Sequence, residues 1–287
     1  MAYTGYRHGV YTSELPTSIL PARTVDSAVV FAVGTAAVQT LSGDAPVNRP
    51  LLFYSHDEAV QALGFDDANF NDYSLQEIIY SHFALYQAAP LICVNVFDPE
   101  RHTSEVEDES LSFSTSAVDE DTASLAHPGV RSVVLKDDGG ETFTEGEDYT
   151  VDAASGIVTR MAAGKIPAGA QVSASYIYAD VSKVTASDVI GGITADGQAT
   201  GLELLDQVFP RFRLVPSIVL CPGFSEIPEV AVVMAAKCDS INGLFRAIAL
   251  VDIPADGENA IINYTDVPAC KEKNNLTDEL CWSAGQR

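Results

Sequence analysis

The sequence has few cationic side chains for its size, and this shortage limits the partners it can bind. Among 287 residues there are 16 Lys and Arg against 40 Asp and Glu, a formal net charge of −24. Nucleic acids and anionic membrane surfaces are bound through clustered Lys and Arg, which displace counterions. We therefore expect no direct nucleic-acid partner.

Long apolar runs and targeting features are also missing. No run approaches the roughly 18–20 apolar residues of a transmembrane helix. Residues 1–7 have neither the charged region nor the apolar region of a signal peptide. The sequence therefore predicts no membrane insertion.

Cysteine is scarce and scattered. The five cysteines are odd in number and form no CxxC pair, so neither a disulfide framework nor a paired-cysteine metal site is indicated. Three of them lie within or beside apolar runs, which predicts buried, reduced thiols. The cysteines are Cys93, Cys221, Cys238, Cys270 and Cys281.

Motifs that bind phosphates or activate a nucleophile are incomplete. Neither GxGxxG nor GxxxxGK[ST] occurs, and the nearest fragment, residues 164–166, lacks the hydroxyl residue that would hold magnesium. Residues 223–226 (GFSE) follow an expected strand and precede an expected helix, as a nucleophile elbow does, but Ile227 replaces the second glycine of GxSxG. A turn or helix-capping role for Ser225 is therefore favoured over a catalytic one.

Metal ligands do not gather in the sequence. The histidines (His8, His56, His82, His102 and His127) are far apart and form neither HxxxH nor HExxH, which argues against a helical zinc site. His82 is expected to be a packed side chain. The acidic stretch of residues 105–109 lacks the pattern of a calcium loop and is interpreted as a solvated linker. We therefore predict no catalytic, cofactor-binding or metal-binding residues, no cofactor and no enzyme activity.

The chain divides into regions of different character. Residues 1–25 combine three tyrosines with Pro16 and Pro21, which forbid a regular helix or a central strand, so an extended arm is predicted. Residues 28–32, 51–54 and 91–97 predict strands. Residues 55–64, with Ser55 as N-cap, and residues 73–89, with Ser74 as N-cap, predict helices. The same alternation returns later as a helix capped by Thr200, a strand at 217–221, a helix at 229–241 and a strand at 247–251.

Between these two stretches the pattern changes to short strands and turns. Residues 130–136, 148–152, 157–160 and 172–178 read as strands. Residues 100–160 hold fifteen Asp and Glu against four Lys and Arg, so this region is acidic.

The predicted fold class is an α/β core, a mixed sheet with flanking helices, interrupted by an inserted all-β domain that resembles a sandwich or barrel. The core is expected at residues 26–109 and 184–287, the inserted β domain at 110–183 and the extended N-terminal arm at 1–25.

Several segments, in order, resemble the contractile tail sheath proteins of phages and related injection machines. PGFS at residues 222–225 follows an apolar strand, and RAIALVDIP at 246–254 follows a helix, as in that family. Further similar segments are residues 6–11, 146–152, 156–160, 166–170, 264–266 and 273–276. The resemblance covers essentially the whole chain.

This resemblance implies a structural role without a cofactor. The expected partners are neighbouring sheath subunits, in hexameric rings stacked helically, and the inner tail tube protein around which the rings lie. The sheath would contract to drive the tube through the target envelope. The implied location is the virion tail, assembled in the cytoplasm of the bacterial host.

The chain also departs from this family, whose members normally continue well past the region of Trp282. If a C-terminal partner strand is absent, residues 1–25 should lack a full docking site, and the protein should be mainly monomeric or weakly associated. Two other functions stay open: an α/β hydrolase-like enzyme with a β insert, and a phage surface or receptor-binding protein whose β insert is the adhesive module.

Overall fold

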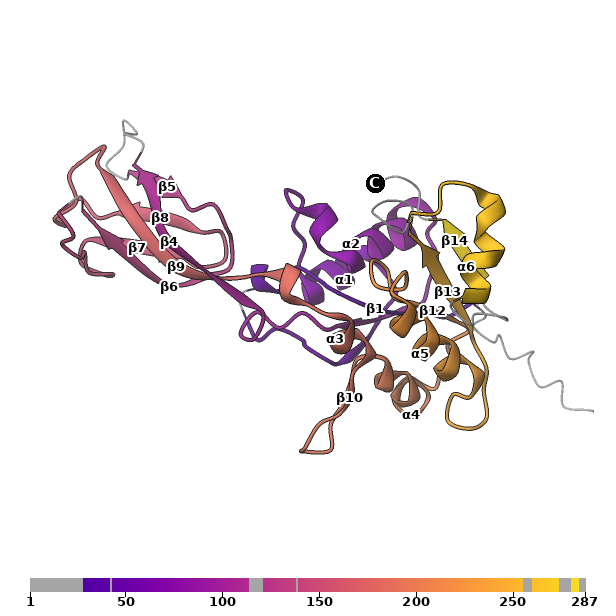
Figure 1. Ribbon diagram of the computed structural model, residues 1–287. Coiled ribbons are helices and arrows are strands. Elements are labelled where there is room, and N and C mark those ends of the chain that lie inside the picture. Colours follow the sequence, from indigo (N-terminus) through magenta and orange to yellow (C-terminus); the bar gives the residue numbers. More distant parts are fainter. Residues whose placement is uncertain are drawn as a thin grey trace, which may run out of the picture.

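The structure is a computed structural model that describes residues 28–41, 43–113, 121–137, 139–254, 260–273 and 280–283. The arm expected at residues 1–25 lies outside the described residues. Figure 1 shows two parts, an α/β body and an elongated unit of strands that projects from it. We call them the β unit, which contains strands β4 to β9, and the α/β body, which contains the six-stranded sheet.

A six-stranded sheet runs through the α/β body in the order β14-β13-β12-β1-β3-β2. All neighbouring strands are parallel except β2 and β3. Parallel strands need long crossover connections, which the helices between them provide. The strands are β1 (Val30–Gly34), β2 (Pro50–Phe53), β3 (Leu91–Asn95), β12 (Ile218–Leu220), β13 (Ile248–Ile253) and β14 (Leu280–Ser283).

Helices cover both faces of this sheet, with α1 and α2 on one face and α3, α4 and α5 on the other (Figure 1). The α-helices are α1 (His56–Leu63), α2 (Ser74–Ile79), α3 (Ala186–Ile190), α4 (Val208–Phe212), α5 (Pro228–Asp239) and α6 (Val267–Lys273). A π-helix spans Tyr80–Leu85, and 3-10 turns span Val38–Thr40, Phe70–Asp72, Val181–Lys183, Gly201–Gln207 and Tyr264–Asp266. Within the described part of the chain, none of these helices has the length and apolar character that crossing a membrane requires.

Local signals explain the first helix. The Ser55 hydroxyl accepts a hydrogen bond from the Glu58 amide at 3.3 Å, and the Glu58 carboxylate accepts one from the Tyr54 amide at 3.0 Å. Gly64 ends the helix with a φ of 75°, a conformation that favours glycine. The prediction of a helix at residues 55–64, with Ser55 as its N-cap, is confirmed.

The second helix differs from the helix predicted at residues 73–89. It begins at Ser74 and continues as a π-helix, in which the Tyr86 amide donates to the Ser81 carbonyl. The prediction that Ser74 is an N-cap is wrong, because its hydroxyl instead accepts a hydrogen bond from the Thr35 amide, 39 residues away.

The prediction that Thr200 caps a helix is confirmed in position, because Thr200 is the N-cap residue, but its side chain does not act as the cap. Thr200 precedes a 3-10 helix, and no hydrogen bond from its side chain caps that helix. Its hydroxyl is engaged in the two-stranded ribbon of β10 (Gly192–Ile193) and β11 (Ala199–Thr200), where it contacts both the amide and the carbonyl of Gly192. This ribbon projects away from the body in Figure 1.

The β unit consists of two three-stranded antiparallel sheets, β4-β9-β6 and β5-β8-β7. The Tyr149 hydroxyl donates to the Val133 carbonyl at 2.8 Å and so joins the two sheets. The strands are β4 (Thr103–Ser112), β5 (Thr122–Ser124), β6 (Val130–Lys136), β7 (Tyr149–Asp152), β8 (Ile157–Arg160) and β9 (Gln171–Ala179).

The long strand β4 starts inside the region that the sequence assigned to the α/β core. It pairs with β9 from Thr103 with Ala179 to Ser112 with Gln171. The boundary expected at residue 110 therefore falls within a continuous strand. The acidic residues 105–109 belong to this strand, so their interpretation as a linker is wrong.

Two separate hydrophobic clusters fill the interiors of the two parts. The first surrounds the six-stranded sheet and includes Phe31 and Leu91, both fully buried. The second lies between the sheets of the β unit and includes Leu135 and Val158, also fully buried. Each part thus has its own core, as an independently packed unit requires.

Candidate interaction surfaces

Ser225 lies in the turn between β12 and α5, where the sequence suggested a nucleophile elbow. It is 1% exposed. Its hydroxyl donates to the Asp252 carboxylate at 2.8 Å and accepts from the Asp252 amide at 3.0 Å. Both hydroxyl functions are therefore used inside the fold, and the helix N-cap is Ile227. Ser225 is a turn residue that ties this loop to β13.

A cleft of about 430 Å³ lies at the carboxyl ends of β1 and β12, against the base of the β unit. In the strand order, β3 is the neighbour of β1 toward one edge of the sheet, and β12 is its neighbour toward the other edge. The cleft therefore lies at the topological switch point, which is where ligands of open α/β sheets bind. The lining includes Thr35, Ser74, His127, Asp180 and Phe224.

Several polar groups of this cleft are engaged in hydrogen bonds within the fold. The Thr35 amide donates to the Ser74 hydroxyl at 3.0 Å, and the Ser74 amide donates to the Thr35 hydroxyl at 3.0 Å. Asp180 accepts hydrogen bonds from the side chains of Ser104 and Ser182. The His127 ring stacks on the Tyr178 ring at 3.8 Å. The cleft therefore resembles a joint between the two parts more than a reaction site.

A buried polar cluster reinforces that joint. His102 is 4% exposed, and its Nδ1 atom accepts a hydrogen bond from the Asp98 amide at 3.0 Å. Its Nε2 atom lies 3.5 Å from the Asp188 carboxylate, which also binds Arg101. Burial disfavours the ionised form of Asp188. Hydrogen bonds from the amide and hydroxyl of Thr185, together with the Arg101 charge, outweigh burial and hold the pKa of the carboxyl below its usual range.

The other histidines within the described residues are packing groups. His82 meets the Phe83 ring edge-on at 5.9 Å, and burial lowers its pKa. This confirms the prediction of a packed side chain. His56 meets Phe65 in the same way, while His8 lies outside the described residues. No group of three His, Cys, Asp or Glu side chains that could hold a metal ion occurs in the described part of the chain.

The cysteines and the phosphate-loop fragment have structural surroundings. Cys93, Cys221 and Cys238 are buried, which confirms the prediction of buried thiols for these three, and burial raises the pKa of the Cys93 and Cys221 thiols. Cys270 is half-buried, and the Cys281 side chain lies outside the described residues. The amide of Lys165 donates to the Asp148 carboxylate at 2.7 Å, so residues 164–166 anchor a turn of the β unit.

Two edges of the six-stranded sheet are open to a partner. Within the described residues, β2 pairs only with β3 and β14 pairs only with β13. An edge strand presents unpaired backbone N–H and C=O groups, to which a strand of another chain can add. These edges lie at opposite sides of the α/β body.

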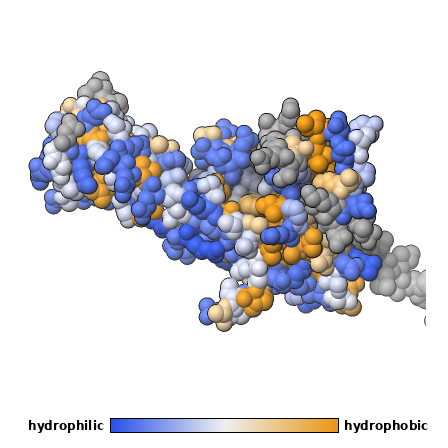
Figure 2. All heavy atoms as spheres, in the orientation of Figure 1, coloured by the Kyte–Doolittle hydropathy of each residue, from blue (hydrophilic) through white to orange (hydrophobic). Residues whose placement is uncertain are grey.

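Charge is distributed unevenly between the two parts. Residues 103–180 contain fifteen Asp and Glu against four Lys and Arg, whereas residues 201–248 contain five against four. Figure 2 shows hydrophilic residues over most of the visible face of the β unit, while apolar residues gather over the α/β body. Residues 201–248 are thus a nearly neutral part of an acidic chain.

Sequence reasoning missed the partners of the residues it singled out. Asp252 belongs to the segment 246–254 that carried the family resemblance, but no local pattern links it to Ser225. Asp188 could have been found as the N3 residue of a capping box with Thr185, since both hydrogen bonds of that box are present. Its contacts with Arg101 and His102, 87 and 86 positions away, have no local signal.

Comparison with known proteins agrees with the resemblance to tail sheath proteins. A family model described as a protein of unknown function matches residues 100–188, which include all of the β unit. The tail sheath protein of Burkholderia phage BcepMu is 36% identical over 251 residues, covering 87% of this chain and 49% of that protein. A putative prophage major tail sheath protein of Pseudomonas aeruginosa strain UCBPP-PA14 is 36% identical over 86 residues, covering 30% of this chain and 21% of that protein. This chain thus spans about half the length of the BcepMu relative.

Proposed function

The chain is a homologue of phage tail sheath proteins over most of its length, and we propose that it acts as a structural subunit of a contractile sheath. In this proposal, hexameric rings of subunits stack helically around an inner tube. The sheath then shortens and drives the tube through the target envelope. The homology supports this function, and it supports a place in a virion tail among other sheath subunits. The tube partner, the ring symmetry and assembly in the host cytoplasm are parts of the proposal.

The open edges of the six-stranded sheet are the structural observation that favours such an assembly. A subunit that must stay linked to its neighbours while it moves needs contacts that survive rotation. Backbone pairing between an extended segment and a sheet edge meets that need, because it is formed by main-chain groups along a strand. We propose that extended segments of neighbouring subunits add to β2 or to β14.

The arrangement of the strands also bears on how the chain is divided into domains. The two groups of strands, β1–β3 and β12–β14, share one sheet although the β unit separates them in sequence. We propose that they form a single α/β domain into which residues 103–180 are inserted. The separate hydrophobic cluster of the β unit supports this division.

The hydrolase alternative has less support. A catalytic serine needs an exposed hydroxyl within reach of a general base, whereas the Ser225 hydroxyl is buried and bonded to a carboxylate and an amide. The relatives carry tail sheath names, and sheath proteins are structural. The receptor-binding alternative would require the β unit to bind a glycan.

Immunogold electron microscopy of the phage particles tests the proposed function. Antibodies raised against this chain should label the tail shaft at regular positions along its whole length. The labelled length should shorten in particles whose tails have contracted. Label confined to the capsid, the baseplate or the fibres would contradict a sheath function, and label on fibre tips would favour receptor binding.

A further inference from the structure

A basic patch with an exposed apolar side chain lies on the α/β body, on a chain that is otherwise strongly acidic. We define the basic patch as Arg211, Arg213, Leu244 and Arg246. The Phe209 and Phe245 rings beneath it are 5.1 Å apart, and the Arg213 guanidinium lies 5.8 Å from the centre of the Phe209 ring. Leu244 is 80% exposed. This ring pair joins α4 to the loop after α5, so the four residues of the basic patch come from two elements that are in contact.

Two guanidinium groups of the basic patch have no ion pair within the described residues. The nearby carboxylates are engaged elsewhere: Glu203 and Asp206 face Lys237, and Asp239 binds Arg246 at 3.1 Å. Asp206 also accepts a hydrogen bond from the Asn242 amide. Arg211 and Arg213 are exposed and face solvent without a carboxylate partner among these residues.

The β unit carries the complementary surface. We define the acidic strand face as Glu105, Glu107 and Asp108 of β4, all three exposed. A β-bulge falls between Val106 and Glu109, and Asp108 has a φ of 55°. In a regular strand successive side chains point to opposite faces, and the bulge breaks this alternation, so two successive carboxylates are exposed. In the described residues, none of the three carboxylates has an ion pair.

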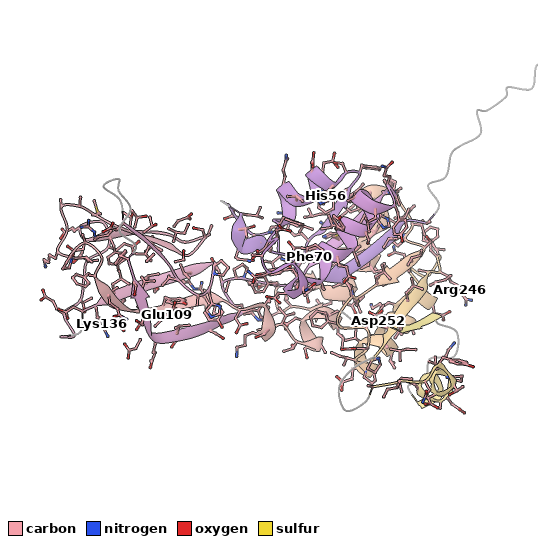
Figure 3. All side chains as sticks on the ribbon, turned by 90° about the horizontal axis from the view of Figure 1, so that it is seen from above. His56, Phe70, Glu109, Lys136, Arg246 and Asp252 are labelled. Atoms are coloured by element: carbon pink, nitrogen blue, oxygen red, sulfur yellow. The ribbon has the colours of Figure 1, made fainter. Side chains whose placement is uncertain are left out.

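These two surfaces cannot meet within one molecule. Figure 3 shows Glu109, the next residue of β4, and Arg246 at opposite ends of the molecule. Figure 1 likewise places β4 in the projecting unit and α4 at the lower edge of the α/β body. Any contact between the two surfaces must therefore join two copies of the chain.

We infer that the acidic strand face of one copy docks on the basic patch of the next copy. Two different surfaces meet in such a contact, so the contact is head-to-tail and can repeat into rings or helical stacks. The occupant is a second copy because it supplies three exposed carboxylates, none in an ion pair among the described residues, although Asp108 accepts a hydrogen bond from the Ser173 hydroxyl. These carboxylates can meet the guanidinium groups of Arg211 and Arg213, and Arg binds carboxylates in a defined forked geometry. This inference rests on the proposed function, since it names one contact of the sheath.

A charge-swap experiment on the whole chain tests the contact. Variant A carries Arg211→Glu and Arg213→Glu, and variant B carries Glu105→Lys and Glu107→Lys. Self-association is measured by sedimentation velocity over a range of concentrations. Each variant alone should associate at least about tenfold more weakly than the wild type, because like charges then face each other. An equal mixture of A and B should recover association, since the acidic strand of A fits the patch of B and the basic strand of B fits the acidic patch of A.

The controls separate this contact from overall repulsion. A double variant Lys165→Glu and Lys183→Glu changes two exposed lysines and has the same net charge as variant A, and it should associate like the wild type. Variant B has a smaller net negative charge than the wild type, so overall repulsion alone would make it associate more strongly. Wild-type association with no loss in A or B would overturn the contact and leave the sheath proposal intact. A wild type that stays monomeric at every concentration, or a mixture that does not recover, would also overturn the contact.

Discussion

Ser225 and Asp252 form a reciprocal pair across the carboxyl end of the six-stranded sheet. The serine hydroxyl donates to the aspartate side chain at 2.8 Å and accepts from the aspartate main chain at 3.0 Å. The two residues come from two segments, PGFS and RAIALVDIP, by which the sequence resembles sheath proteins. The pair thus joins the two segments: one supplies the turn after β12 and the other supplies the strand beside it.

Replacing Ser225 with Ala should destabilise the fold without creating a large cavity. The change removes two hydrogen bonds and leaves the Asp252 amide and carboxylate short of a partner, which costs roughly 1–3 kcal/mol. Urea denaturation followed by circular dichroism measures the loss. Ser187→Ala, at an exposed position of α3, is the matched control and should change the free energy of unfolding by less than about 0.5 kcal/mol. Equal stabilities of the two variants would show that the pair contributes nothing.

Elements that depend on local chemistry could be predicted from the sequence. The first helix has its cap, its first-turn acids and its terminating glycine within ten residues, and the structure has that helix. The apolar run at residues 91–97 was expected to be a buried strand, and Leu91–Asn95 is a strand with five buried residues. In both cases the signal is complete within the segment itself.

Elements that depend on distant partners could not be predicted. The Ser74 hydroxyl bonds the Thr35 amide, and the Thr200 hydroxyl bonds Gly192, so neither is free to cap a helix. Strand β4 reads as an acidic linker because its outward side chains are charged, and only its pairing with β9 makes it a strand. The Ser225–Asp252 pair belongs to the same class, because its members are 27 residues apart.

A charge placed in the centre of the sheet should be strongly destabilising. Val94 is fully buried in β3, between Val33 of β1 and Pro50 of β2. The Val94→Asp variant would bury an unpaired carboxylate and should lose about 3 kcal/mol or more. Val232→Asp, with the same substitution at a residue of α5 that is 46% exposed, is the control and should have a near-normal melting temperature. A Val94→Asp protein as stable as this control would mean that β3 is not a core strand.

The ribbon of β10 and β11 depends on one glycine. Gly191 has a φ of 68°, and a Cβ atom there would lie 1.9 Å from the Thr200 carbonyl oxygen. Gly191→Ala should therefore cost about 1–3 kcal/mol from backbone strain, together with displacement of Thr200. Gly192 is the neighbouring control, because a Cβ there meets nothing within 4 Å, and Gly192→Ala should change stability by less than about 0.5 kcal/mol. Thermal denaturation measures the melting temperatures of the two variants, and Gly191→Ala should melt at the lower temperature. Similar melting temperatures would contradict the prediction.

Asp148 makes the stability of the β unit depend on pH. Its two carboxylate oxygens accept hydrogen bonds from the Thr144 amide at 2.9 Å and the Lys165 amide at 2.7 Å. The Thr144 bond first, and then the Lys165 bond, hold the pKa of the carboxyl below its usual range. A carboxyl group with a lowered pKa in the folded state stabilises the fold fully above its unfolded pKa of about 3.9. That stabilisation is lost as the pH falls through the folded pKa.

Asp148→Asn should therefore lower stability at neutral pH, and the difference from the wild type should shrink as the pH falls below about 4. The asparagine amide has only one oxygen, so one of the two backbone donors loses its acceptor. Hydrogen exchange of the Thr144 and Lys165 amides reports the effect locally, so other titrating carboxylates do not obscure it. Glu147→Gln, at the exposed neighbouring position, removes the same charge and should leave the exchange of both amides unchanged. A difference between the Asp148→Asn variant and the wild type that stays constant from neutral pH into acid would mean that the carboxylate charge is not what holds this turn.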